Sequence, residues 1–122
     1  MLLLASALVF ITGLAHSYLG ERYILIRLFR SEQLPKLFGS TAFTTGTLRF
    51  AWHITTVAWW GIACLLFLAA QGPLSKDEVL DVIGAISLMS AALPLYFTRG
   101  KHFSWVVFLL VGALTLLSRS GI

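Results

Sequence analysis

Four mostly apolar stretches, separated by segments that hold most of the charged residues, divide this chain. They cover about residues 2–20, 50–70, 79–97 and 102–117. A helix of roughly 20 apolar residues spans about 30 Å of hydrocarbon, and each stretch approaches that length. No stretch alternates between apolar and polar positions as the strands of a membrane barrel do. The pattern therefore predicts an all-α integral membrane four-helix bundle, with residues 1–122 in one domain.

The third stretch has the clearest start signal. Ser75 precedes Asp77 and Glu78, which is typical of a helix N-cap followed by acidic residues in the first turn. Pro94, near the other end of this stretch, favours a bend in the helix. The first stretch is predicted to be a retained helix. A competing interpretation makes residues 1–15 a signal peptide, but the basic segment that normally precedes such a peptide is missing.

Composition narrows the class of protein further. The chain is 58% hydrophobic and 11% charged, with a mean hydropathy of +0.89, which exceeds what 122 residues can bury in water. A soluble domain and a disordered chain are both excluded. Cys64 is the single cysteine, which excludes a disulfide scaffold. The net charge of +4 comes from scattered residues without a basic stripe, so we expect a lipid bilayer and no nucleic acid as partner.

The distribution of Lys and Arg predicts an orientation in the membrane. Most of them lie in or beside the first loop, about residues 21–48, or in the third loop, which joins the third and fourth apolar stretches: Arg22, Arg27, Arg30, Lys36, Arg49, Arg99 and Lys101. Basic loops stay on the cytoplasmic side, so both chain ends are predicted to lie on the non-cytoplasmic side. Within the first loop, residues 23–30 mix apolar residues with Arg, as in a helix lying against headgroups. The residues that follow, up to Thr47, are predicted to be flexible.

All three histidines fall at the same predicted membrane face, which suggests a site. His16 ends the first span, His53 begins the second and His102 begins the fourth. Three imidazoles with the carboxylate of Glu21 match the ligands of Zn, Mn or Fe, with Glu21 as a further ligand or as a catalytic base. Glu21 follows His16 by five positions, about 140° around an ideal helix, so joining that group requires the chain to unwind at Gly20.

Helical phase predicts which faces point inward. His53 shares a face with Arg49, Thr56, Trp60 and Cys64, the more polar stripe of its helix. His16 lies on a face of small residues that includes Gly13 and Gly20. The third helix is predicted to turn one small or polar face to the interior: Ser87, Ser90, Ala91, Pro94 and Thr98.

Structural interpretations of the same residues remain open. Each histidine is compatible with a hydrogen bond to a carbonyl or hydroxyl, and Glu21 with an ion pair to Arg22, Arg49 or Arg99. Trp60 and its neighbour Trp59 lie too deep for the interfacial belt, which leaves core packing or contact with a flat cofactor such as haem b. Cys64 is predicted to be a small core residue.

Three classes of function fit these observations. The first is a metal-binding or redox-active site in a polar pocket that opens to the cytoplasm. The second is a non-catalytic membrane subunit that packs against a copy of itself or a larger membrane partner through small residues such as Ser87, Ala91 and Gly112. The third is a small carrier or proton-linked channel. Against the third, the outer half of the bundle offers almost no ionisable residue between Cys64 and Asp77 or beyond Trp105.

Two motifs resemble a known group of proteins. Residues 15–22, Ala-His-Ser-Tyr-Leu-Gly-Glu-Arg, are followed by residues 48–53, Leu-Arg-Phe-Ala-Trp-His. These segments and the spacing of the spans are similar to small four-span bacterial inner-membrane proteins of unassigned function. The resemblance implies a multi-pass protein of the bacterial cytoplasmic membrane, and it implies no reaction, cofactor or site.

Overall fold

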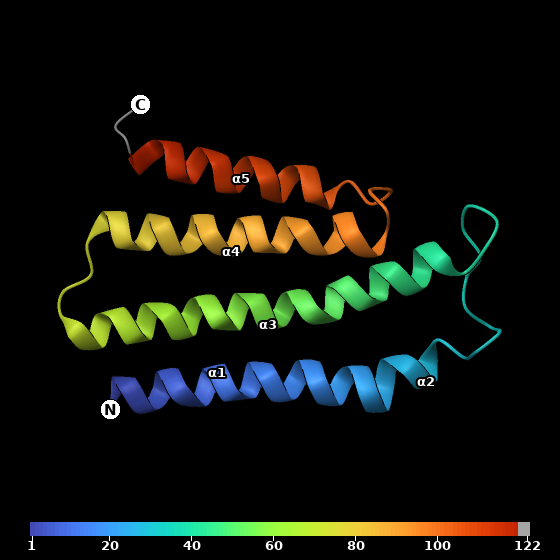
Figure 1. Cartoon of the computed structure of the whole chain (residues 1–122), viewed down its shortest axis with the longest axis horizontal. Helices are drawn as coiled ribbons and strands as arrows, with labels where there is room; N and C mark the ends of the chain where they lie inside the picture. Colours follow the sequence, from blue (N-terminus) through green and yellow to red (C-terminus); the bar gives the residue numbers. More distant parts are fainter. Residues whose placement is uncertain (120–122) are drawn as a thin grey trace.

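The computed structural model describes residues 1–119, and these are almost entirely helical. The elements are α1 (Leu2–Leu19), the π-helix η1 (Gly20–Leu25), α2 (Ile26–Leu28), α3 (Ala42–Gln71), α4 (Lys76–Phe97) and α5 (Ser104–Arg119). Because α1, η1 and α2 follow one another without a break, they form a single helix, as Figure 1 shows. The prediction of an all-α protein with four helices is confirmed.

Three of the four helices are long and apolar enough to cross a membrane. They are Leu2–Leu28, Ala42–Gln71 and Lys76–Phe97, with 27, 30 and 22 residues. The fourth, Ser104–Arg119, is apolar but shorter. Its 16 residues extend roughly 24 Å at 1.5 Å per residue, less than the thickness of the hydrocarbon layer.

Two boundaries differ from the predicted ones. Residues 23–28 continue the first helix beyond Gly20, because the backbone hydrogen bonds pass through η1 without interruption, and their position against headgroups stays a prediction. Helix α3 begins at Ala42, not near Phe50, so the segment up to Thr47 is not a flexible approach. The start of α3 is held by Ser40, which accepts the Ala42 N–H, and by Thr44, which donates to the Pro35 carbonyl.

The four helices form an open row and not a bundle closed around an axis. Helix α1 packs on α3, α3 on α4 and α4 on α5, and within residues 1–119 no contact joins α1 to α4 or α5. Figure 1 shows this antiparallel row in one layer. The accessible surface is 7904 Å², whereas a compact protein of this mass exposes about 6,500 Å². Many large apolar side chains of all four helices are accordingly exposed to the surroundings.

Small residues set the spacing between α4 and its neighbours. A Cβ atom at Gly84 would meet Leu116, and one at Gly112 would meet Leu88, so α4 and α5 approach closely. At the interface of α3 with α4, a Cβ at Gly46 would collide with the backbone oxygen of Phe97. The predicted inward face of α4 is confirmed, since each of its members is buried: Ser87, Ser90, Ala91, Pro94 and Thr98.

The predicted start of α4 is also confirmed. Ser75 and Glu78 form a capping box, in which each side chain bonds the backbone N–H of the other residue. Figure 1 shows the end of α2, the start of α3, the end of α4 and the start of α5 at one end of the row. The start of α1, the end of α5 and the turn between α3 and α4 lie at the other end. Which end faces the cytoplasm stays a prediction.

Candidate functional site

Glu21 lies at the centre of a charged cluster between α3 and the first helix. Its Oε1 accepts from Arg49 Nη2 at 2.6 Å, and its Oε2 accepts from Arg49 Nε at 3.2 Å. The same Oε2 lies 2.9 Å from His53 Nε2. Side-chain exposure is 30% for Glu21, 31% for Arg49 and 18% for His53. Arg49 was one of three predicted ion-pair partners of Glu21, and its two-pronged contact confirms that interpretation.

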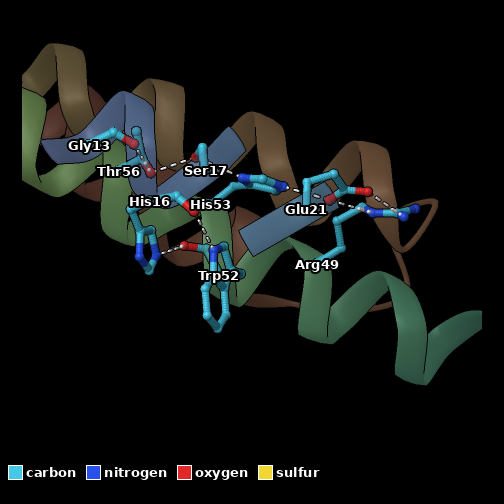
Figure 2. A network of polar contacts seen from close by, with 8 residues as sticks. All are labelled: Gly13, His16, Ser17, Glu21, Arg49, Trp52, His53 and Thr56. Carbon is cyan, nitrogen blue, oxygen red and sulfur yellow. Dashed lines mark hydrogen bonds and ion pairs between the residues drawn. The ribbon is translucent and has the colours of Figure 1, made fainter. Parts of the chain in front are cut away.

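The cluster continues toward the middle of the helices as a chain of hydrogen bonds. His53 Nδ1 lies 2.8 Å from Ser17 Oγ, which lies 2.6 Å from Thr56 Oγ1. Thr56 then donates to the Gly13 carbonyl at 3.2 Å. Figure 2 shows the line of side chains from Arg49 to Gly13. From Glu21 to Gly13 this path covers roughly 12 Å of helix.

The spacing of residues along two helices explains the alignment. Gly13, Ser17 and Glu21 follow one another at intervals of four, so they form one stripe on the first helix. On α3, His53 lies four positions after Arg49 and three before Thr56, which makes a matching stripe. Ser17 was missed by the sequence analysis, which assigned the inward stripe to His16. Its interval of four residues from both Gly13 and Glu21 is the signal that identifies it.

The π-helix begins beside the cluster. The Ile26 N–H donates to the Glu21 carbonyl, five residues earlier, and Leu25 is buried with 2% exposure. The helix thus widens locally from Gly20 onward, and the Glu21 carboxylate lies against His53, while His16 bonds the Trp52 carbonyl. Gly20 is needed because a Cβ atom there would collide with the indole of Trp52. Such wider turns occur often at functional sites.

His16 belongs to a separate contact with Trp52. Its Nε2 lies 3.2 Å from the Trp52 carbonyl, and Trp52 Nε1 donates to the His16 carbonyl at 3.0 Å. The two rings stack in parallel with centroids 4.6 Å apart. In Figure 2 this pair lies apart from the line that leads through His53. His16 therefore fastens α1 to α3 by a reciprocal hydrogen bond and a stacked ring.

His102 lies in the turn before α5 and is bonded locally. Its ring Nδ1 is 2.8 Å from Ser104 Oγ, and its backbone N–H donates to Thr98 Oγ1. Its ring packs against Phe50 and Phe43, with centroids 4.8 and 6.0 Å away. Across residues 1–119 there is no group of three or more His, Cys, Asp or Glu arranged to hold a metal ion. The predicted ligand group of His16, His53 and His102 with Zn, Mn or Fe thus stays a prediction without an assembled site.

Trp60 packs against the first helix. Its ring stacks on Phe10 with centroids 5.5 Å apart, and its Nε1 donates to the Phe10 carbonyl at 3.4 Å. Gly13 makes room for this indole, since a Cβ there would lie 2.9 Å from Trp60 Nε1. Core packing thus accounts for Trp60, while a cofactor-binding role with haem b stays a prediction. Cys64 is exposed on α3, so its prediction as a core residue is wrong.

A cavity of about 340 Å³ adjoins the hydrogen-bonded chain. It lies over α3, in the space between α1 and α4, because those two helices do not pack on each other. Most of its wall is formed by five mainly apolar side chains: Val57, Trp60, Met89, Ala92 and Leu93. Three polar side chains lie together in the rest of the wall: Ser17, His53 and Thr56. Ligand pockets commonly combine apolar walls with a few convergent polar groups in this way.

Ser17, His53 and Glu21 make the side-chain contacts of a hydrolytic triad, but they lack the surrounding groups that such a triad needs. A nucleophilic serine needs backbone N–H groups aimed at the oxyanion. Ser17 lies inside α1, where backbone N–H groups are used by the helix. Its hydroxyl is also bonded to Thr56. The chemistry that this arrangement supports is hydrogen bonding and charge stabilisation.

The chain of contacts from Glu21 through His53, Ser17 and Thr56 ends at the Gly13 carbonyl. A carbonyl accepts a hydrogen bond but donates none. Within the described residues, these hydrogen bonds therefore end between α1 and α3.

Comparison with known proteins gave no similarity to build on: no family model, curated protein or solved structure matches this chain. Fold and composition define it as a small helical protein with candidate transmembrane helices. Beyond this, any assignment of function depends on the site itself.

Proposed function

We propose that this chain is a small multi-pass membrane protein that binds an amphiphile. The apolar chain of the ligand lies in the cavity between α1 and α4, and its polar end lies toward Ser17 and His53. The observation that carries the proposal is the shared lining of that cavity: apolar side chains from α3 and α4 meet Ser17 and His53 of the hydrogen-bonded network.

The placement of charge supports an amphiphile over a purely apolar ligand. Ionisable groups within a span are costly and are usually retained for a function. Arg49 neutralises Glu21, and the basic residues of the loop end lie beyond them, where lipid headgroups are expected. A ligand aligned with the helices would place its polar end at this cluster and its chain deeper in the membrane. We place the site at a bacterial inner membrane on the resemblance alone.

Contacts of the histidines favour binding over metal chemistry. His16 and His53 both form hydrogen bonds between helices, and His102 bonds within its own turn. These contacts support the non-catalytic alternative for the histidines themselves. No reaction is assigned to Glu21, whose carboxylate oxygens accept from Arg49 and lie within hydrogen-bonding distance of His53.

The test is photo-crosslinking with a diazirine-bearing fatty acid in phosphatidylcholine nanodiscs, mapped by mass spectrometry. We expect labelling concentrated on Met89, Ala92 and Leu93, and competition by unlabelled fatty acid. Ala92→Trp fills the cavity and should abolish this labelling. Ala113→Trp, on the exposed surface of α5, is the matched control and should leave it unchanged. Labelling spread evenly over all exposed helix faces, without competition, would overturn the proposal.

The open row favours a second function, assembly with another membrane chain. Helices α1 and α5 each pack on one neighbour only, so both edges of the row are unpartnered within residues 1–119. The small residues first considered for this role do not supply the surface, because Ser87, Ala91 and Gly112 are buried inside the chain. An assembly would therefore use the edges. Cross-linking in native membranes that yields only the monomer rules it out.

A further inference from the structure

A second cavity, of about 380 Å³, lies at the loop end of the row. It is bounded by the start of α3, the end of α4 and the turn that leads to α5. Three cationic side chains line it, Arg49, Arg99 and Lys101, and no carboxylate does. Within residues 1–119, neither Arg99 nor Lys101 forms an ion pair. The cavity therefore holds two positive charges, those of Arg99 and Lys101, that no carboxylate of the described residues neutralises.

The backbone at Arg99 carries an independent sign of a specific role. Helix α4 ends in a Schellman motif, in which the Gly100 N–H bonds the Leu95 carbonyl and the Arg99 N–H bonds that of Tyr96. Arg99 holds the left-handed position of this motif with a φ of 51°. Glycine is favoured there, and a side chain costs about 1 kcal/mol. The chain thus keeps an arginine, whose side chain lines the cavity, at a position where glycine is the more stable residue.

Arg49 connects this cavity to the cluster at Glu21. It uses Nε and Nη2 for the carboxylate, and in the part of the chain that the structure describes Nη1 has no protein acceptor. Its guanidinium also lies over the Phe97 ring, 5.9 Å from the centroid, and that ring stacks against His53 at 6.3 Å. Because Phe97 lines the second cavity and His53 the first, the two cavities are neighbours.

We propose that this second cavity binds a phosphate group, either as the headgroup of an anionic lipid or as free phosphate. Two guanidinium groups and an ammonium group suit the several oxygens of a phosphate, which accept charge-assisted hydrogen bonds from them. The inference goes beyond the proposed function, because the phosphate contacts all lie in the second cavity, whereas the polar end of the proposed amphiphile lies at Ser17 and His53 in the first. The phosphate contacts need no apolar chain, so the inference does not rest on that function.

The experiment measures binding to the full chain in phosphatidylcholine nanodiscs with and without phosphatidic acid, and separately with inorganic phosphate. Thermal stabilisation and lipid retained in native mass spectrometry are the readouts. Stabilisation by phosphatidic acid but not by inorganic phosphate assigns the site to a lipid. Equal stabilisation by inorganic phosphate assigns it to free phosphate and leaves the amphiphile proposal to the crosslinking test. If neither probe changes the midpoint of unfolding, the inference is wrong.

Two variants separate a specific site from general attraction. Lys101→Gln should weaken binding about tenfold or more, the scale of one hydrogen bond to a charged group. Lys76→Gln, at the opposite end of the row, is its control and should leave binding unchanged. Equal losses in both variants would mean that the phosphate is attracted by overall charge, which contradicts the proposal.

Arg99→Gly gives the sharpest separation of binding from folding. Glycine relieves the left-handed strain, so the variant should unfold at an equal or higher temperature without ligand. It should nonetheless lose about tenfold or more in phosphate affinity. A variant that keeps full affinity for phosphate shows that Arg99 does not contribute to a site.

Discussion

The interface of the first helix with α3 and that of α4 with α5 bring helices together by different means. At α4–α5, the contact depends on glycines, since Gly84 and Gly112 admit the side chains of Leu116 and Leu88. At α1–α3, glycines are also present, but charged and hydroxyl side chains run through the contact. Close packing of small residues and interhelical hydrogen bonds both join helices in a membrane. The two interfaces thus differ in polarity, and only the polar one adjoins the cavity that we propose for a ligand.

The largest effect is expected from Glu21→Ala, which removes the acceptor shared by Arg49 and His53. Two donors then lose their acceptor within a span. Removing one member of a buried pair costs about 3–5 kcal/mol, and partial exposure reduces this to about 2 kcal/mol. Unfolding in mixed detergent micelles, followed by tryptophan fluorescence, measures the loss. The double variant Glu21→Ala/Arg49→Ala should lose less than the sum of the single variants. Strict additivity would show that the pair is not coupled.

At the apolar α4–α5 interface, Gly112→Ala should lower the free energy of unfolding by about 1–2 kcal/mol, because the added methyl group would overlap Leu88. This loss should leave fatty-acid labelling at Ala92 unchanged, since the cavity is lined by α1, α3 and α4. The same micelle unfolding and crosslinking assays apply. A variant that lowers labelling as much as stability would mean that the two interfaces do not act separately.

Ser17→Ala should have a smaller effect on stability, about 0.6–1 kcal/mol, because hydrogen bonds between membrane helices contribute modestly. Its effect on the ligand is the informative part. Ser17 lines the cavity and bonds His53, so labelling by the fatty acid should shift or weaken while the fold persists. Wild-type labelling in a folded Ser17→Ala protein would place the polar end of the ligand elsewhere.

The smallest change is expected from Thr115→Val, the control for removing a hydroxyl. Its Oγ1 donates to the Val111 carbonyl of the same helix and joins no other helix. The free energy of unfolding should stay within about 0.5 kcal/mol of the wild-type value. Labelling by the fatty acid should equal that of wild type within the error of the assay. A loss matching that of Ser17→Ala would show that any hydroxyl removed from these helices has the same effect.

Much of the fold was predictable from the sequence because hydrophobic length and caps are local properties. The capping box at Ser75 and the inward face of α4 follow from residue types at fixed intervals. The open row was not predictable, since which helices remain apart depends on contacts distant in sequence. The start of α3 at Ala42 was missed because Gly and Thr, which favour loops, are held helical by Ser40 and neighbouring contacts.

The site was predicted in part. Glu21 with Arg49 and the inward aim of His53 follow from helical phase and from the cost of ionisable groups in a span. A group of three histidines does not follow, because sharing a membrane face leaves each ring free to turn to a different neighbour: His16 to Trp52, His102 to Ser104. Ser17 was available from its spacing. The π-helix at Gly20 has no sequence signal that distinguishes it from an ordinary helix.

Solid-state NMR in bilayers can locate a ligand in the first cavity, by magnetisation transfer from a carbon-labelled fatty acid to the protein. We expect strong transfer to Ala92 and Val57, with the carboxyl end of the ligand near the His53 ring, and none above background to Ala113. Equal transfer to Ala92 and Ala113, as from bulk lipid, would mean that the cavity holds no specific ligand.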